Sequence, residues 1–506
     1  MPSARLPLQL TLVIAALRAV WLIGAYFLTD SVRRHHVESI LIIGAAAAML
    51  YFVVLPAAAD TKPRGQVHWA AAMVASTVGA LLLYWPVLTL GWLSDDWVLA
   101  DRAARGEFIS AAHEFVRPVP LLVWRALFAL GGAAPATHAL NLLLHAVNGA
   151  ATVVLARELG ASRQSAWFAG LAFLVWPTQI EAIAWASCIF DVLMTAAVLA
   201  VILLYTRWAT CLTGPRVALI LAAAALALAS KETAVAIPAL LVVTSAPRWR
   251  RVRPRVGELF TLIAISIACV LYLVWRVWFS PWAASAHVPA AIRYASKELV
   301  SRTFAGLAVP FDSETVVRYP VVVAVFASFF VVFSVTALVV AKERQRRHVL
   351  LAQSLMWCVA SAAPAIGYLF IGSDLQGSRY LYLPAVGWAW FIGSITEFIL
   401  FRGKARRWLQ AAVVSALLAC AAVQGRVLIG HWQTSAAMRD SLLRQAKEVA
   451  IGEGCGTLHL ASVPTPYRGT QLFLNGFEQA VDTISLKERG RACVVRWDGA
   501  LLQLTD

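Results

Sequence analysis

Two adjacent carboxylates, Asp95 and Asp96, follow an apolar run at residues 70–92 almost directly. An acidic pair next to hydrocarbon is costly, and it persists where it faces water, a metal ion or a cationic partner. A carboxylate in such a place can act as a general base toward a hydroxyl group. We therefore interpret residues 90–108 as the catalytic loop of a membrane enzyme. The alternative is that the pair only marks the exit of the chain from the membrane.

The two carboxylates are expected to differ in role, because neighbouring side chains rarely point the same way. We expect Asp95 to be the base. Asp96 then orients it, or the pair binds a divalent metal ion through its oxygens.

Further charged residues lie between or beside the later apolar runs. Arginine and lysine hold phosphate groups well, so we expect Arg379, Lys231 and Arg117 to bind the phosphate of a substrate. The alternative for Arg379, beside Tyr380, is ordinary anchoring at the membrane interface. The residues expected to line a substrate cavity are His138, Asn141, His145, Glu181, Asp191, Glu232 and Tyr380.

Four polar residues, His138, Asn141, His145 and Asn148, recur along one apolar run. Their spacing places them on one face of a helix, and this face must meet protein or a water-filled cavity. The alternative to a cavity is hydrogen bonding between helices. No third ligand lies nearby in the sequence, so we expect no histidine-based metal site.

The composition is that of a polytopic membrane protein. Of the 506 residues, 60% are hydrophobic and 14% are charged, against about 25% charged in an average soluble domain. We expect an all-α bundle of about thirteen transmembrane helices at residues 1–430. The predicted spans are roughly 8–28, 40–59, 70–92, 137–156, 167–176, 190–205, 217–229, 235–245, 259–279, 319–340, 349–371, 381–400 and 409–429.

Basic residues in short loops predict the orientation. With the N-terminus in the cytoplasm, the three densest basic runs between spans, 248–255, 342–348 and 402–407, become cytoplasmic. The loop at 31–36 disagrees, because it falls on the outer face. Most of the net charge of +16 lies in these short loops, where basic residues set the topology and contact anionic lipids of the bilayer. We therefore expect no nucleic-acid partner.

The tail at residues 431–506 has few apolar runs, and we predict a small extracytoplasmic module of α+β or β type. Cys455 and Cys493 lie in this tail. An oxidising compartment permits a disulfide between them, and two free buried thiols are the alternative.

The order of these motifs resembles the GT-C superfamily of polytopic glycosyltransferases. The nearest likeness is to the protein O-mannosyltransferase-like branch, which includes the transmembrane and tetratricopeptide-repeat O-mannosyltransferases and their bacterial relatives. The matching pieces are SDDW, RPVP, HALNLLLH, WPTQIEAIAWASCIFDVL, ASKET and SRYLYLPAVG. Two features depart from the family pattern. No tetratricopeptide repeats follow the last span, and the turn reads WPTQIEA, where relatives commonly carry a histidine in place of Trp176 or Gln179.

The resemblance implies an inverting transfer of a monosaccharide from a polyprenyl-phosphate-linked donor to a hydroxyl of a protein or glycan acceptor. It also implies that the reaction takes place on the extracytoplasmic face of a bacterial inner membrane. The first-loop acidic motif of the family maps onto Asp95 and Asp96, and its phosphate-binding residues map onto Arg379 and Lys231. A transporter or flippase of a lipid-linked sugar is the alternative function, because it too uses charges within a membrane.

Overall fold

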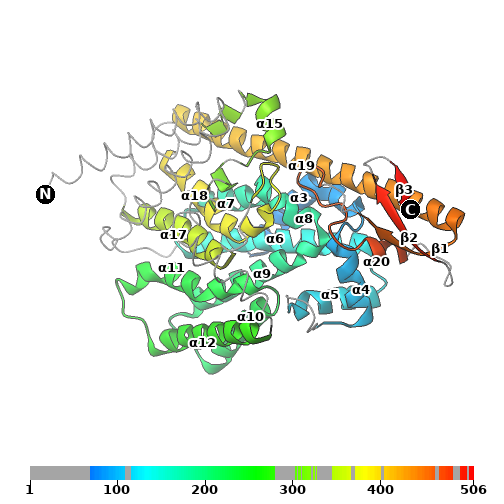
Figure 1. Cartoon of the computed structure of the whole chain (residues 1–506). Helices are drawn as coiled ribbons and strands as arrows, with labels where there is room; N and C mark the ends of the chain where they lie inside the picture. Colours follow the sequence, from blue (N-terminus) through cyan, green and yellow to red (C-terminus); the bar gives the residue numbers. More distant parts are fainter. Residues whose placement is uncertain are drawn as a thin grey trace.

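The computed structural model describes residues 69–108, 116–279, 310–320, 345–365, 371–399, 404–461, 466–482, 491–497 and 501–505, with a few positions between 303 and 327. The predicted spans at 8–28 and 40–59 lie outside these residues. The described chain is mostly helical, with one small sheet near its end (Figure 1).

The first half of the bundle is formed by α3 (Trp69–Tyr84), α4 (Asp95–Arg105), α5 (Pro118–Ala129), α6 (Ala134–Glu158), α7 (Arg163–Val175), α8 (Ile180–Ala184) and α9 (Ile189–Trp208). The second half contains α10 (Gly214–Leu228), α11 (Ile237–Trp249), α12 (Val256–Phe279), α15 (Ser313–Arg318), α17 (Gln345–Ala362), α18 (Pro384–Ile399) and α19 (Lys404–Glu453). Short 3-10 turns connect them at Trp85–Thr89, Pro177–Gln179, Ala186–Cys188, Glu232–Ala236, Ala363–Ala365 and Ser378–Leu381.

Four helical segments of the described chain are long and apolar enough to cross a membrane: Trp69–Thr89, Ala134–Glu158, Ala186–Trp208 and Val256–Arg276. A fifth is counted if Arg163–Val175 and Pro177–Ala184, bent by 53°, form one span. The bend follows from Pro177, because the residue before a proline is disfavoured in the α conformation. Trp176 is accordingly extended. The count of thirteen spans and the orientation stay predictions.

The longest helix, α19, has 50 residues and runs across the bundle to the sheet (Figure 1). It passes residue 430 without a break, so no loop marks the predicted boundary between 430 and 431. The sequence becomes polar there, but alanine, glutamine, arginine, lysine and glutamate all sustain a helix. The division into domains 1–430 and 431–506 stays a prediction.

The tail carries β1 (Cys455–Leu460), α20 (Phe477–Asp482), β2 (Arg491–Trp497) and β3 (Leu502–Thr505). The strands form a sheet in the order β1-β2-β3, in which β1 and β2 are parallel and β2 and β3 antiparallel. The described part of the tail thus contains both helix and strand, and a separate extracytoplasmic module stays a prediction. A disulfide joins Cys455 to Cys493, with Cα atoms 5.8 Å apart, and so ties β1 to β2.

Replacing Cys455 or Cys493 by serine should destabilise this tail module. The disulfide closes a loop with a sequence separation of 38, and cross-linking such a loop is worth about 4 kcal/mol in the chain-entropy model. Protease cleavage of the tail should therefore begin at a lower temperature in either variant. Cys211→Ser is the matched control, because Cys211 is exposed and unbridged. Equal cleavage temperatures in all four proteins would contradict the prediction.

Candidate active site

Asp96 is fully buried at the first turn of α4, and both of its carboxylate oxygens accept backbone hydrogen bonds. Oδ2 accepts from the Leu93 N–H at 2.9 Å, and Oδ1 accepts from the Ser187 N–H at 2.6 Å. The first donor belongs to the loop before α4, and the second to the turn Ala186–Cys188. Asp96 therefore fastens the first loop to the hairpin between α8 and α9.

Burial raises the pKa of Asp96 from 3.8 to about 7, although the two N–H donors act in the opposite direction. Desolvation penalises the charged form of a carboxyl group, whereas hydrogen bonds to its oxygens favour that form. Asp96 lies beyond the end of the apolar segment Trp69–Thr89.

Asp95 is only partly buried, and its partner comes from the tail. Its Oδ1 accepts a hydrogen bond from the Asn475 side-chain amide at 2.7 Å. The neighbouring Ser94 makes further contacts with the same tail segment: its N–H donates to the Leu472 carbonyl at 3.0 Å, and its Oγ accepts from the Leu474 and Asn475 N–H groups at 3.1 and 3.3 Å. The tail module thus closes directly over the acidic pair.

The same loop is held from two further helices. Arg439, 6% exposed on α19, donates from Nη1 to the carbonyls of Leu90 and Trp92, each at 2.7 Å. A Cβ atom on Gly91 would lie 2.8 Å from that nitrogen, and the φ of +68° at Gly91 also favours glycine. His138 Nε2 on α6 lies 2.9 Å from the Gly91 carbonyl.

Arg379 forms an ion pair with Glu181, one of the predicted cavity carboxylates. The Arg379 backbone N–H also donates to Glu181 Oε2, at 2.8 Å. The guanidinium lies 4.9 Å from the ring centroid of Trp185 and 4.8 Å from that of Tyr380. Trp185 in turn donates its indole N–H to the Leu93 carbonyl at 3.1 Å, so one side chain connects Arg379 with the loop of the acidic pair.

Lys231 pairs with Asp191 at 2.5 Å, and its Nζ lies 5.0 Å from the ring centroid of Tyr380. The Tyr380 ring therefore contacts both the ammonium group of Lys231 and the guanidinium of Arg379. Two of the three predicted phosphate-binding cations thus lie against one aromatic ring.

Arg117 binds Glu232 with two hydrogen bonds, at 2.6 and 3.0 Å, and Arg276 reaches the same carboxylate at 3.3 Å. Arg276 was not expected from the sequence. A charge buried in an apolar protein requires a partner of opposite charge. These ion pairs supply such a partner for Glu181, Asp191 and Glu232 and for their cations. Together the four cations and three carboxylates carry a net charge of +1.

The side chains of the three predicted phosphate-binding residues differ in access. Arg379 is 22% exposed, Arg117 15% and Lys231 3%. Each of them already contacts a carboxylate, so a phosphate has to share or displace that partner. The order of exposure favours Arg379 for this role, which stays a prediction.

The polar stripe on α6 is fully buried, and each of its members has a partner in a neighbouring segment. Asn141 donates to the Trp185 and Ala186 carbonyls, and Asn148 donates to the Val192 carbonyl. His145 Nδ1 lies 2.8 Å from the Tyr382 hydroxyl. These contacts match the alternative of hydrogen bonding between helices, and a place for the stripe in a substrate cavity stays a prediction.

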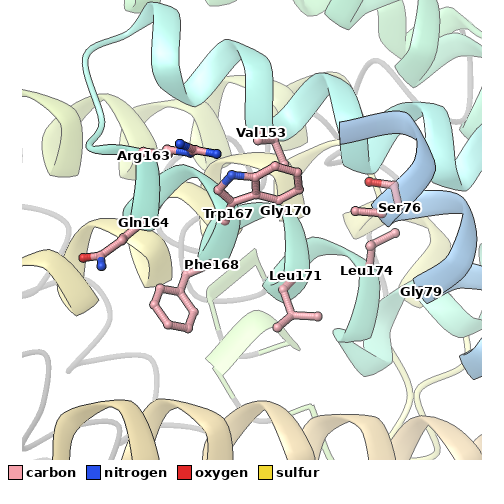
Figure 2. A pocket seen from close by; sticks show the side chains of 11 residues that line it. Ser76, Gly79, Val153, Arg163, Gln164, Trp167, Phe168, Gly170, Leu171 and Leu174 are labelled. Carbon is pink, nitrogen blue, oxygen red and sulfur yellow. The ribbon is translucent and has the colours of Figure 1, made fainter. Parts of the chain in front are cut away.

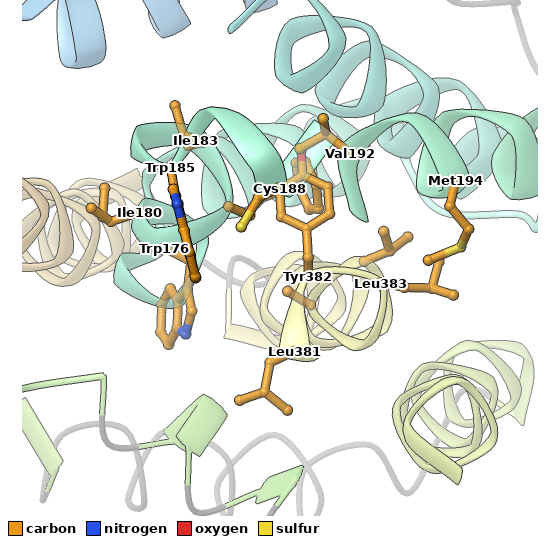
Figure 3. Close-up of a cluster of buried hydrophobic side chains, with 14 of the residues drawn as sticks. Trp176, Ile180, Ile183, Trp185, Cys188, Val192, Met194, Leu381, Tyr382 and Leu383 are labelled. Atoms are coloured by element: carbon orange, nitrogen blue, oxygen red, sulfur yellow. The ribbon is translucent and has the colours of Figure 1, made fainter. Parts of the chain in front are cut away.

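Hydrophobic side chains from the same segments form a buried cluster (Figure 3). Its ring side chains include Trp176, Trp185 and Tyr382, of which Tyr382 is 1% exposed. The Trp176 indole donates to the Leu307 carbonyl at 2.9 Å. Trp176, one of the two positions at which a histidine is expected from the family resemblance, is therefore part of the packing here.

The two carboxylates of the acidic pair do not converge on a shared ion position. Both oxygens of Asp96 are occupied by N–H donors, whereas Asp95 points to Asn475. Within the described residues, no group of three or more histidine, cysteine, aspartate or glutamate side chains could hold a metal ion. The geometry therefore does not favour the predicted divalent ion bound by the pair.

No protein-family model matches the chain, and no curated protein sequence matches it. Its backbone is partly similar to two structures of the Archaeoglobus fulgidus oligosaccharyltransferase. One is the AglB complex with an inhibitory peptide and a dolichol-phosphate (12% identity, TM-score 0.44), and the other is the apo form (11%, 0.45). The alignments cover 75% and 84% of this chain but only 58% and 64% of those chains.

A third similar structure is ArnT from Cupriavidus metallidurans bound to undecaprenyl phosphate. It has 13% identity and a TM-score of 0.45, and the alignment covers 85% of this chain and 93% of that one. Similarity at this level assigns neither a family nor a function to the chain.

Asp96→Asn should flatten the pH dependence of stability. Because the native pKa is about 7 and the ordinary value is 3.8, the native state keeps a proton that the unfolded chain releases between these values. The contribution of this protonated carboxyl group to the free energy of unfolding is fully present below about pH 4 and is lost as the pH rises to about 7. Asparagine does not titrate, so the variant should lack this decline. It should also be less stable at low pH, by about 1–3 kcal/mol, because one backbone N–H then meets an amide NH₂.

Thermal unfolding at pH 5 and pH 8 measures both effects. Asp101→Asn is the matched control, since Asp101 lies on the same helix and forms an exposed pair with Arg105. An Asp96→Asn variant with the pH profile of the unaltered protein would show that Asp96 does not titrate in this range.

Proposed function

We propose that the chain is a membrane glycosyltransferase of the GT-C class. It transfers a monosaccharide from a polyprenyl-phosphate-linked donor to a hydroxyl of a protein or glycan acceptor, with inversion at the anomeric carbon. The observation that carries this proposal is the link through Trp185, which contacts Arg379 and hydrogen-bonds the loop of Asp95. A candidate base and candidate phosphate-binding cations thereby belong to one connected site.

In this reaction Asp95 accepts the proton of the acceptor hydroxyl, and the oxygen attacks the anomeric carbon. The bond from that carbon to the phosphate oxygen breaks, and the lipid phosphate leaves with the electron pair. A single displacement of this kind inverts the carbon. Arg379, supported by Lys231 and Arg117, stabilises the negative charge that develops on the phosphate.

The partly exposed carboxylate suits the base, and the buried one suits a positioning residue. Among the residues that the structure describes, Asp95 accepts a side-chain hydrogen bond from Asn475 alone, and it retains acceptor capacity for a hydroxyl proton. Asp96 has both oxygens engaged. This supports Asp95 as the base.

The proposal includes the membrane location. The site lies at the end of α3 opposite to Trp69, where the tail module also packs. We place this end on the extracytoplasmic face of a bacterial inner membrane, with the N-terminus in the cytoplasm, as the basic loops predict.

The direct test is turnover of the purified full-length protein with a panel of polyprenyl-phosphate sugars and candidate acceptors. An enzyme should release free polyprenyl phosphate together with a glycosylated acceptor. A transporter or flippase would leave every donor intact, and this outcome across the panel would overturn the proposal.

Asp95→Asn should lower turnover by about 10²-fold or more, because general-base help is typically worth 10²- to 10⁴-fold. Asparagine cannot accept the proton, which lowers turnover. Because it keeps the size of the side chain, binding of the sugar donor should be retained. Asp101→Asn, an exposed change on the same helix, should keep normal turnover. Near-normal turnover in Asp95→Asn would remove Asp95 from the chemistry.

Asn475→Ala should lower kcat about fivefold and leave the KM for the donor unchanged. The side-chain amide orients Asp95, and a hydrogen bond of this kind is worth about 1 kcal/mol. Asn475→Gln, which keeps the amide, should recover part of the loss. An equal fall in kcat for the alanine and glutamine variants, with a lowered melting temperature in both, would indicate a role in folding only.

A further inference from the structure

A groove of about 700 Å³ opens between α3, α6 and α7, away from the proposed active site. Figure 2 shows Arg163 and Gln164 at one end of it, and Leu174 with Gly79 at the other. The wall between these ends is apolar and includes Ala75, Val153, Trp167, Phe168 and Leu171. A groove with an apolar wall and a cationic end suits a molecule with an anionic head and a hydrocarbon tail.

The length of the groove matches one leaflet of a bilayer. Arg163 and Leu174 are eleven residues apart on α7, which corresponds to about 16 Å at the rise of an α-helix. Half of a hydrocarbon core of roughly 30 Å is about 15 Å. Trp167 lies one turn inside Arg163, in the order expected where a helix enters the membrane from its interface.

The charged end of the groove lies at the far end of α7 from the active site. The helix begins at Arg163 and ends at Val175, and the hairpin that carries Glu181 follows. Within the part of the chain that the structure describes, no ion pair of Arg163 is found. Arg157 lies near the same end, where it binds the Ala161 carbonyl and adds positive charge.

We propose that this groove binds an anionic phospholipid from the leaflet opposite the active site. The phosphate of the lipid contacts the Arg163 guanidinium, with Gln164 as a further donor, and one acyl chain lies along α7 toward Leu174. The inference stands apart from the proposed glycosyltransferase activity, because it uses none of the residues of that site.

Native mass spectrometry of the purified full-length protein in detergent tests the proposal, with phosphatidylglycerol and phosphatidylcholine of identical acyl chains as probes. The protein should retain one phosphatidylglycerol about tenfold more tightly than phosphatidylcholine, because a charge-assisted contact to phosphate favours the anionic head. Arg163→Gln should remove this preference. Arg251→Gln is the matched control, since Arg251 is an exposed arginine outside the groove.

Ala75→Trp tests the apolar wall. Ala75 is exposed and lines the groove, so a tryptophan there fills the space and should abolish retention of both lipids. Val78→Trp places the same side chain on an exposed part of α3 that does not line the groove, and should change nothing. Unchanged melting temperatures of the lipid-free variants show that they fold.

Equal retention of the two lipids by the unaltered protein, or unchanged retention in both Arg163→Gln and Ala75→Trp, would overturn the proposal. Failure of the unaltered protein to retain any lipid would do the same. Displacement of phosphatidylglycerol by a more tightly bound polyprenyl phosphate would assign the groove to that lipid instead.

Discussion

A buried carboxylate without contact to water, that of Asp96, determines how the proposed active site is built. Such a group is stable only if its oxygens accept hydrogen bonds, and here the donors are the N–H groups of Leu93 and Ser187. Between these two donors the chain forms the transmembrane-length helix α6 and the bent helix pair α7 and α8. Their shared acceptor therefore fixes the first loop against the hairpin. Asp96 points into the protein, whereas Asp95 lies beside the tail and accepts a hydrogen bond from the Asn475 side chain.

The same requirement for partners organises the cations. Removing one member of a buried ion pair is strongly destabilising, because the other charge is left uncompensated. The pairs Glu181–Arg379, Asp191–Lys231 and Glu232–Arg117 therefore hold separate segments of the bundle together, with Arg276 as a second cation on Glu232. The resulting net charge of +1 suits the binding of a phosphate, and Tyr380, whose ring contacts both Arg379 and Lys231, suits its sugar or lipid substituent.

Apolar runs in the sequence predicted most of the helices that the structure describes, because hydrophobic length alone indicates a span. The sequence also indicated that charges within apolar stretches need partners, because an unpaired charge there is costly. It did not predict their pairing: the partner of Arg117 is 115 residues away. Nor did it predict Arg439, whose acceptors are the carbonyls of Leu90 and Trp92. Backbone acceptors leave no pattern in a sequence, so only the fold brings such a residue to the site.

We propose that a lipid phosphate is held on the cationic side of a site whose base is Asp95. The most direct measurement is an experimental structure of the full-length protein with a bound polyprenyl phosphate. We expect the phosphate within hydrogen-bond distance of the Arg379 guanidinium and beside Tyr380, on the side facing Asp95. A phosphate bound elsewhere, with the Arg379–Glu181 pair unchanged, would contradict it.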